Sequence, residues 1–128
     1  KIINIEALNM IEMAKRDIIP GVSDFVAELC QNVASKRAVS ERVPCNAEIK
    51  LIDKLSQLND NASAAVEKLE SDLKSVDRRE VLSASQSMAH LIVPDMEAVR
   101  AIVDEMETLT SADYWPYPTY FDLLYSVK

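Results

Sequence analysis

The sequence predicts an all-α protein, an antiparallel bundle of three long helices, and three observations support this. The chain of 128 residues has a single glycine, Gly21, so it is poor in the residue on which the turns between strands depend. Ala, Leu, Glu, Lys and Met are abundant, and all favour helix. Apolar residues recur every three or four positions, which is the helical period. The length is that of one domain, so residues 1–128 are expected to form a single helical domain.

The first helix is predicted from about Asn4 to Arg42. Because proline lacks a backbone donor and clashes with the preceding turn, we expect a kink near Pro20 or a break into two collinear pieces. Val43-Pro44 then ends the helix. The apolar stripe that predicts this helix consists of Ile11, Ala14, Ile18, Val22, Phe25, Leu29 and Val33.

The second helix is predicted to begin after Asn46, which is a favourable N-cap residue. Its apolar residues follow an almost regular heptad pattern, which indicates long helices packed at shallow angles. This seam consists of Leu51, Leu55, Leu58, Ala62, Ala65, Leu69, Leu73 and Val76. Pairs at i,i+4 spacing, such as Glu12 with Arg16, Glu70 with Lys74 and Lys68 with Asp72, are interpreted as solvated surface.

The third helix is predicted to start at Asp77, where Glu80 three residues later resembles a capping box. The loop before it is so short that the second and third helices must be antiparallel neighbours. Pro94 does not disturb the apolar phase, so we expect a kinked continuous helix to about Leu109. The stripe consists of Leu82, Ser85, Ala89, Ile92, Met96, Val99, Val103 and Met106.

Residues 114–128 form an aromatic tail that carries six of the seven aromatic residues of the chain. Pro116 and Pro118 end the third helix and favour an extended corner. Thr119 and Asp122 fit a capping motif for a short last helix from Tyr120 to about Val127. Such a helix is marginal alone in water, so the tail is expected to pack on its own bundle or on a larger assembly.

Seven residues of this tail are the candidate structural or interface residues. We expect Trp115 to act as an anchor, the two prolines as a rigid corner, and Phe121 with Leu124 as an apolar plug. The full set is Trp115, Pro116, Tyr117, Pro118, Tyr120, Phe121 and Leu124.

Other residue patterns point away from catalysis. Cys30 and Cys45 are too few for a disulfide framework, lack metal-ligand spacing and are expected to be reduced thiols. His90 is preceded at the third position by Ser87 rather than glutamate, so a di-metal bundle site is not predicted, and His90 is expected at the surface. Helical spacing spreads the acidic residues of the third helix over several faces, and we interpret them as solvated; they are Asp95, Glu97, Asp104, Glu105 and Glu107.

The overall charge narrows the classes of partner. The formal net charge of −7 repels phosphate backbones, so nucleic acid is not an expected partner. No uncharged apolar run reaches the ~18 residues of a membrane span, so no membrane is expected either. Glycine-rich phosphate loops are absent from the sequence. We therefore assign no catalytic, cofactor-binding or metal-binding residue, and this chain alone is not expected to be an enzyme.

Three segments resemble the C-terminal region of the type III glutamine synthetases. They are "NIEALNMIEMAKRDIIPGVS", "VPDMEAVRAIVDEMETL" and "DYWPYPTYFDLLYSV", in the order of that family and nearly from end to end of the chain. Gly21, where alanine would be expected, and Tyr125, where phenylalanine is commoner, are departures from the pattern. The first residue is Lys1 rather than Met, which fits the expectation of a C-terminal fragment.

The resemblance implies a parent enzyme of several hundred residues that uses ATP and magnesium to join ammonia to glutamate in the cytoplasm. It implies catalytic residues upstream of this segment, and partners in the catalytic body and in neighbouring subunits of a ring-shaped oligomer. This segment would have a structural or assembly role. The alternative is a free-standing helical adaptor whose seams bind partner helices.

Overall fold

The computed structural model describes residues 2–77 and 88–118, and all structural statements concern these residues. They form α1 (Ile2–Met13), η1 (Ala14–Ile18), α2 (Ile19–Val39), α3 (Asn46–Asp77), η2 (Met88–Ile92) and α5 (Val93–Leu109), where η denotes a π-helical turn. The described residues contain no strand. The predicted all-helical fold is confirmed.

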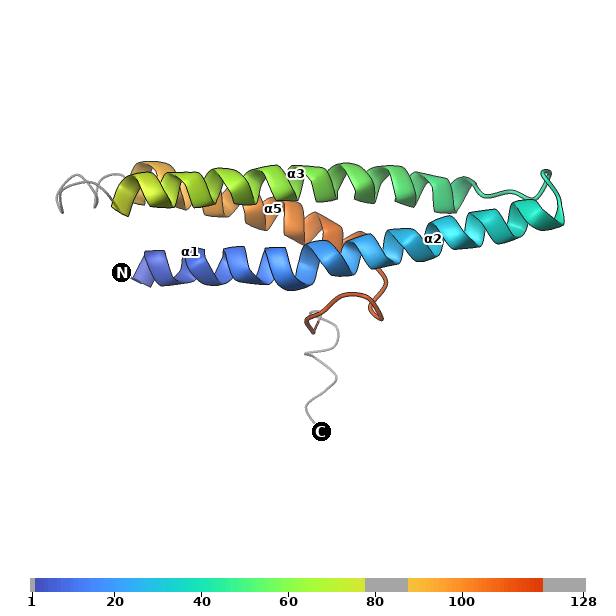
Figure 1. The fold of residues 1–128 in the computed structure, drawn as a ribbon, viewed down its shortest axis with the longest axis horizontal. Coiled ribbons are helices and arrows are strands. Elements are labelled where there is room, and N and C mark those ends of the chain that lie inside the picture. Colours follow the sequence, from blue (N-terminus) through green and yellow to red (C-terminus); the bar gives the residue numbers. More distant parts are fainter. Residues whose placement is uncertain (1, 78–87, 119–128) are drawn as a thin grey trace, which may run out of the picture.

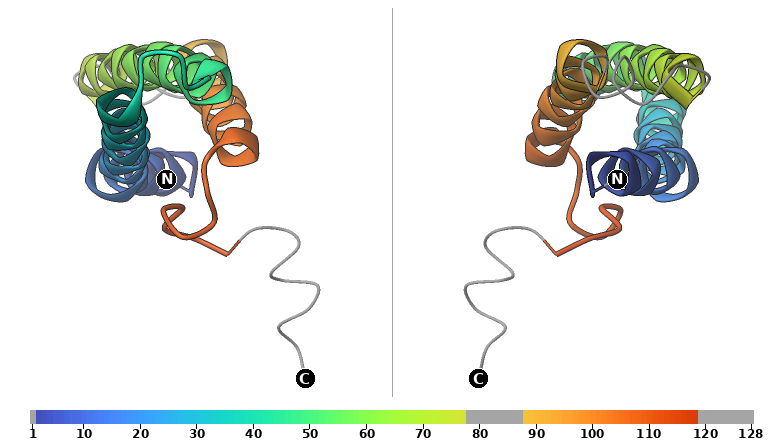
Figure 2. Two further views of the ribbon diagram at one scale, coloured as in Figure 1. Left: turned by 90° about the vertical axis from the view of Figure 1, so that its right-hand side faces the viewer. Right: turned by 90° about the vertical axis from the view of Figure 1, so that its left-hand side faces the viewer.

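The helices form three roughly antiparallel rods. The first rod consists of α1, η1 and α2 in succession, α3 runs back along it, and α5 runs in the direction of α1 (Figure 1). Contacts are extensive between α2 and α3 and between α3 and α5, whereas α1 and α5 touch only sparsely. Seen end-on, α3 lies between the first rod on one side and α5 on the other (Figure 2).

Both internal prolines follow a π-helical turn. Pro20 is the second residue of α2, directly after η1, and Pro94 is the second residue of α5, directly after η2. A proline removes one i→i−4 hydrogen bond and crowds the carbonyl one turn back, and a wider turn there relieves both problems. The helix therefore continues through Pro20 and, as predicted, through Pro94. We call residues 14–21 the first proline junction and residues 88–95 the second.

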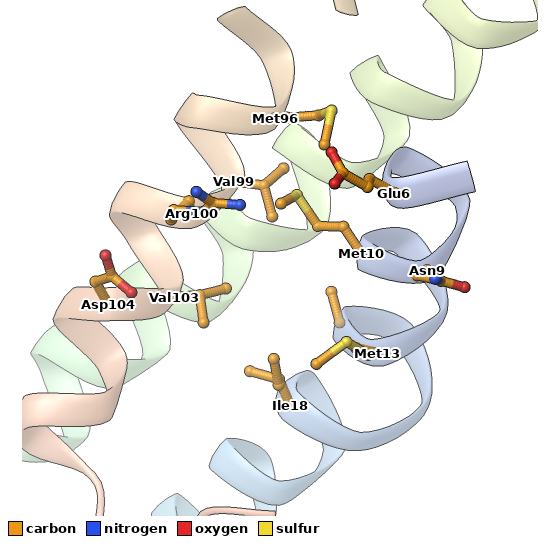
Figure 3. A pocket seen from close by; sticks show the side chains of 11 residues that line it. Glu6, Asn9, Met10, Met13, Ile18, Met96, Val99, Arg100, Val103 and Asp104 are labelled. Carbon is orange, nitrogen blue, oxygen red and sulfur yellow. The ribbon is translucent and has the colours of Figure 1, made fainter. Parts of the chain in front are cut away.

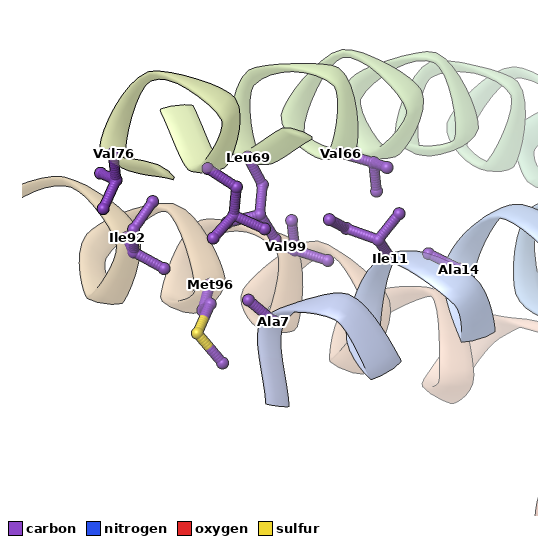
Figure 4. Packing of buried hydrophobic residues seen from close by; sticks show 10 residues of the cluster. Ala7, Ile11, Ala14, Val66, Leu69, Val76, Ile92, Met96 and Val99 are labelled. Atoms are coloured by element: carbon purple, nitrogen blue, oxygen red, sulfur yellow. The ribbon is translucent and has the colours of Figure 1, made fainter. Parts of the chain in front are cut away.

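The core consists of two clusters along the length of the bundle. Cluster 1 lies where α1, α3 and α5 meet, and Figure 4 shows its side chains pointing toward one another. Cluster 2 lies around α2 and the first half of α3. The buried members of cluster 1 are Ala7, Ile11, Ala14, Val66, Leu69, Leu73, Val76, Ile92, Met96 and Val99. Those of cluster 2 are Ile18, Val22, Phe25, Leu29, Leu55, Leu58, Ala62, Met106 and Trp115.

The predicted seams supply most of this core, with local corrections. Val66 is buried at 2% exposure although the predicted seam passed through Ala65, which is only partly buried. The first rod ends at Val39, three residues before the predicted Arg42. The amide of Ser40 donates to the carbonyl of Lys36, and the turn that follows closes with Val43 donating to Ser40.

The start of α3 also differs slightly from the prediction. Asn46 is the first helical residue and not the cap, because the amide of Ile49 donates to the carbonyl of Cys45 at 2.9 Å. Several other predictions fall outside the described residues. These are the capping box through Glu80, the first turns of the third helix, and the short helix from Tyr120 to Val127, including Phe121 and Leu124.

Candidate functional site: the aromatic corner

Residues 111–118 form a tight corner after α5, which we call the aromatic corner. The carbonyl of Ser111 accepts hydrogen bonds from the amides of both Tyr114 (2.9 Å) and Trp115 (3.1 Å). The hydroxyl of Ser111 accepts a third, from the amide of Asp113, at 3.3 Å. This compact turn directs the chain back beneath α2 (Figure 1). Proline at position 116 cannot extend the turn, because it has no amide hydrogen to donate.

Trp115 enters the core of the bundle. Its side chain is 8% exposed and belongs to cluster 2, together with residues of α2, α3 and α5. A buried tryptophan contributes more apolar contact area than any other side chain of this cluster. The side chain predicted to be an anchor thus packs in a cluster to which all three rods of its own chain contribute. Its role toward a larger assembly stays a prediction.

Gly21 lets the backbone of the corner approach α2 closely. A Cβ atom added to Gly21 would lie 2.8 Å from the carbonyl oxygen of Tyr114 and 3.6 Å from Cδ of Pro116. The first distance is a steric clash with backbone, which cannot rotate away. The only glycine of the chain therefore marks where the corner rests on the first proline junction, and this explains why alanine does not occupy the position.

Tyr114 ties the corner to α2. Its ring lies 5.5 Å from that of Phe25, tilted by 40°, which is a favourable aromatic arrangement. Its hydroxyl donates a hydrogen bond to Glu28. That bond raises the pKa of Tyr114, because the carboxylate of Glu28 accepts the phenolic proton and so stabilises the protonated form of Tyr114.

Tyr117 makes the corresponding contact at the first proline junction. Its hydroxyl donates to Oδ2 of Asp17 at 2.5 Å. Partial burial of the ring, together with this bond to a carboxylate, raises the pKa of Tyr117 to about 12. The two predicted corner prolines, Pro116 and Pro118, are exposed on the outside of the chain.

Asn59 of α3 supports the first proline junction from the opposite side. Its side-chain amide donates to the carbonyl of Ile19 at 3.1 Å, next to Pro20. The amide oxygen of Asn59 is buried and has no hydrogen-bond partner among the described residues. A polar residue in an otherwise apolar helical seam favours one register, so this bond aligns α3 with the junction.

Asp95 at the second proline junction corrects the interpretation of the acidic residues as solvated. It is 7% exposed, and its Oδ1 accepts a hydrogen bond from Nζ of Lys68 at 2.9 Å. The same Lys68 nitrogen donates to Asp72 at 3.0 Å. Lys68 and Asp72 thus form the predicted i,i+4 pair, and the exposed Lys68 also links α3 to α5 through Asp95.

The two carboxyl groups of this link have opposite pKa shifts. Burial raises the pKa of Asp95, and the adjacent carboxylate of Asp72 raises it further. Hydrogen bonding to Asp95 and then to Lys68 lowers the pKa of Asp72. Oδ2 of Asp95 is buried and has no hydrogen-bond partner among the described residues.

The remaining chemical candidates are dispersed. His90 is exposed, as predicted, Cys30 is exposed, and Cys45 is buried with its thiol directed at the carbonyl of Val43. Among residues 2–77 and 88–118, no three His, Cys, Asp or Glu side chains come together in a way that could hold a metal ion. Nor does any helix in this part of the chain have the length and apolarity to cross a membrane.

The ion pairs at i,i+4 spacing follow the prediction in part. Arg16 pairs with Glu12 at 2.8 Å. Glu70, predicted to pair with Lys74, instead binds Lys15 of the first rod at 3.0 Å. Such exposed pairs contribute little to stability, but this one adds a contact between η1 and α3.

Comparison with known proteins gives one informative relationship. A glutamine synthetase of Butyrivibrio fibrisolvens is 28% identical to this chain over 129 residues, an alignment that covers the whole chain and 18% of that enzyme. The chain thus spans about a fifth of the length of this curated relative. No protein-family profile matches the chain. No solved structure matches it either.

This relationship confirms the predicted resemblance to a glutamine synthetase. The alignment includes the aromatic corner and both proline junctions, because it covers all of the chain. The chain is accordingly related to a segment of a glutamine synthetase, and its described part is a helical bundle closed by an aromatic corner.

Proposed function

We propose that this chain is the C-terminal helical domain of a type III glutamine synthetase and has a structural, non-catalytic role in it. The observation that carries the proposal is the whole-chain similarity to a segment amounting to 18% of a glutamine synthetase. The three sequence segments that resemble the type III enzymes support the finer assignment. The fold supports it further, since long rods joined by a fixed corner are suited to bracing a larger body.

The parent enzyme would convert glutamate and ammonia into glutamine at the expense of ATP, with magnesium, in the cytoplasm. The partners of this domain would be the catalytic body and the neighbouring subunits of a ring-shaped oligomer. The described residues present no cluster suited to a metal ion. We therefore assign none of them a role toward magnesium or ATP, and both would bind in the catalytic body.

A free-standing adaptor is less well supported by the packing. That alternative needed the apolar seams of the helices to be available for a partner helix. The seam of α3 instead faces α1, α2 and α5 of the same chain, in clusters 1 and 2. What these helices offer to a partner is therefore their outer surface, not their predicted seams.

The test is made on the full-length protein encoded by the gene. The intact protein should form glutamine from glutamate and ammonia only with ATP and magnesium present. Removing residues 114–128 should lower the turnover and shift the sedimentation coefficient toward smaller assemblies. A gene that encodes no glutamine synthetase upstream of Lys1 would refute the assignment, and unchanged turnover and sedimentation after the deletion would refute the structural role.

A matched control separates this role from general damage to the surface. Val39 at the end of α2 is 83% exposed and lies far along the rod from the corner. Val39→Ser should leave both turnover and sedimentation unchanged. Trp115→Ala should reproduce the effect of the deletion, because it removes the contact that fixes the corner to the bundle.

A further inference from the structure

Helix α1 is apolar on every side. Eight of its twelve residues are apolar, and they are Ile2, Ile3, Ile5, Ala7, Leu8, Met10, Ile11 and Met13. Because successive residues of a helix turn by about 100°, these positions are spread around the whole axis. The apolar residues of α3 and α5 are instead concentrated on one side. A helix that is apolar all round is typical of the interior of a protein, since none of its faces is suited to water.

The bundle covers only one side of α1. Ala7 and Ile11 point into cluster 1 and are buried. Ile5 is 59% exposed, Leu8 is 52% exposed and Met13 is 39% exposed. Three of the five large hydrophobic side chains that are exposed in the described part of the chain thus belong to one short helix. Such a concentration of exposed apolar side chains marks a surface that another protein segment covers.

A groove extends this apolar surface from α1 toward α5. It lies between α1–η1 and α5 and encloses about 530 Å³. In Figure 3, Met10 and Met13 line it from α1, and Met96, Val99 and Val103 line it from α5. Flexible thioether side chains adapt to the shape of whatever packs against them. Met13 belongs both to the groove and to the exposed side of α1, so the two form one surface.

The charged residues of the groove have both signs and are exposed. Glu6 lines it from α1, and Arg100 and Asp104 line it from α5. None of the three forms an ion pair within residues 2–77 and 88–118. Exposed polar groups around an apolar centre are typical of a protein–protein interface. With two acids and one base, the groove does not select a partner by net charge, so apolar contact decides what binds.

We propose that α1 and this groove form the surface on which the rest of the glutamine synthetase polypeptide packs. The inference rests on the proposed function and names the part of the bundle that meets the larger body. The alignment covers 18% of the related enzyme, so 82% of that polypeptide lies outside it. The partner is an apolar patch of this remaining chain that covers Ile5, Leu8 and Met13 together.

The size of the surface favours a partner on the same polypeptide over a second copy of the bundle. The surface is as long as α1, about 18 Å, and about two helix widths across, or about 20 Å, which gives about 360 Å². Stable complexes between separate chains bury about 800 Å² on each partner. A covalently connected partner needs less contact, because the chain holds it nearby at a high effective concentration.

Site-specific photo-cross-linking in the full-length enzyme tests the proposal. The photoreactive amino acid p-benzoylphenylalanine is placed at position 8 in one variant and at position 39 in another. Leu8 and Val39 are both exposed apolar residues, and they lie toward opposite ends of the first rod. Position 8 should cross-link to the chain outside residues 1–128 at a yield at least about tenfold above that of position 39. On a denaturing gel the product should keep the mass of one polypeptide.

The same experiment defines the results that would overturn the proposal. These are cross-links from position 8 that stay within residues 1–128, a product with the mass of two polypeptides, and a yield equal to that of position 39. A doubled mass would assign the surface to a second subunit. Glutamine formation is measured on the same samples. An enzyme that makes glutamine but lacks the expected cross-link would overturn this inference and leave the proposed function intact.

Hydrogen exchange gives an independent readout with a matched pair of substitutions. Leu8→Asp places a charge on the proposed contact surface, and Val39→Asp places the same charge at the far end of the first rod. In the full-length enzyme the amides of α1 should exchange at least about tenfold faster in Leu8→Asp than in the unmodified enzyme, and at an unchanged rate in Val39→Asp. Equal exchange of α1 in all three proteins would contradict the proposal. Faster exchange throughout α3 in Leu8→Asp would place the effect in the packing of the bundle itself and would also overturn it.

Discussion

The two proline junctions use the same backbone geometry but differ in what contacts them. In each, a π-helical turn is followed by a proline as the second residue of the next α-helix. After Pro20 the next residue is Gly21, and the aromatic corner rests on its bare Cα. After Pro94 the next residue is Asp95, whose buried carboxylate binds Lys68 of α3. The first junction is thus secured by backbone contact, and the second by charge.

This difference shows which part of a proline junction the local sequence determines. The proline and the apolar residues before it dictate that the helix must widen. The residue after the proline decides what can lie against the widened turn. Gly21 has no side chain, so the backbone of the aromatic corner can lie against it. Asp95 has a short carboxylate side chain, which binds Lys68 of the neighbouring helix. Substitutions at these two places should therefore have different physical consequences.

The largest effect is expected from Trp115→Ala, which removes the largest buried side chain of cluster 2, the cluster that includes Ile18 of the first junction. Loss of a buried tryptophan should lower the free energy of unfolding by about 3–5 kcal/mol. Urea unfolding followed by circular dichroism measures this. Ile92→Ala at the second junction is the comparison: it should cost about 2–5 kcal/mol but leave the fluorescence of Trp115 blue-shifted. A red shift in Ile92→Ala would mean that the two junctions are not separate packing regions.

Gly21→Ala should have the next largest effect on stability, and it tests the close contact between Gly21 and the backbone of Tyr114. Alanine favours helix by about 1 kcal/mol over glycine, but its Cβ would clash with the carbonyl of Tyr114, at a typical cost of about 1–3 kcal/mol. We expect net destabilisation of about 1 kcal/mol in thermal or urea unfolding.

A shortened chain supplies the control for this substitution. In a chain ending at Ser111 the carbonyl of Tyr114 is gone, so Gly21→Ala should stabilise the bundle by about 1 kcal/mol. The same sign in both chains would show that the corner does not rest on Gly21.

Asp95→Asn tests the charged character of the second junction through pH. The folded-state pKa of Asp95 is raised, so its contribution is present below the pKa of the unfolded chain and is lost as pH rises through the folded value. Asp72 has a lowered pKa and behaves in the opposite way, with its contribution lost as pH falls. The asparagine variant should gain stability over the unmodified chain as pH rises from 3 to 7, measured by urea unfolding at each pH. A constant difference between the two chains would contradict this.

The smallest effect is expected from Tyr117→Phe at the first junction. Loss of the bond to Asp17 should cost about 1 kcal/mol at neutral pH. The pKa of Tyr117 is raised to about 12, so the bond should stabilise the fold below pH 10 and be lost as pH rises toward 12. The difference in stability between the two chains should therefore shrink above pH 10. A difference that stays constant to pH 11.5 would show that the contribution of the hydroxyl group does not depend on its ionisation and would contradict this prediction.

The sequence predicts the rods and most of the core because helical period and apolar character are local properties. Ile11, Leu55 and Met96 are buried as expected. The π-helical turns are not predicted. A spacing of three or four residues between apolar positions varies enough along an ordinary helix to hide the one extra residue of such a turn. The meaning of Gly21 is not predicted either, because it depends on Tyr114, which is distant in sequence and close only in the fold.

The sequence singles out Trp115, which is buried, but not the residues that surround it in the fold. The tail identifies Trp115 and the prolines by composition alone. That Asp95 is buried could not be read from the sequence, because its carboxylate resembles its exposed neighbours on α5 and its partner Lys68 is on another helix. Whether a polar side chain is buried depends on partners that are distant in the sequence, and helical spacing carries no information about those partners.

The 32-residue α3 is continuous from Asn46 to Asp77 and contains neither proline nor glycine. At 1.5 Å per residue it is about 48 Å long, and it has no weak point along this length. Such a helix behaves as a stiff lever. A tilt of α3 by about 10° at one end would displace its other end by about 8 Å. A partner that binds the turn at residues 40–45 and tilts α3 would therefore move the opposite end of the bundle without bending the helix.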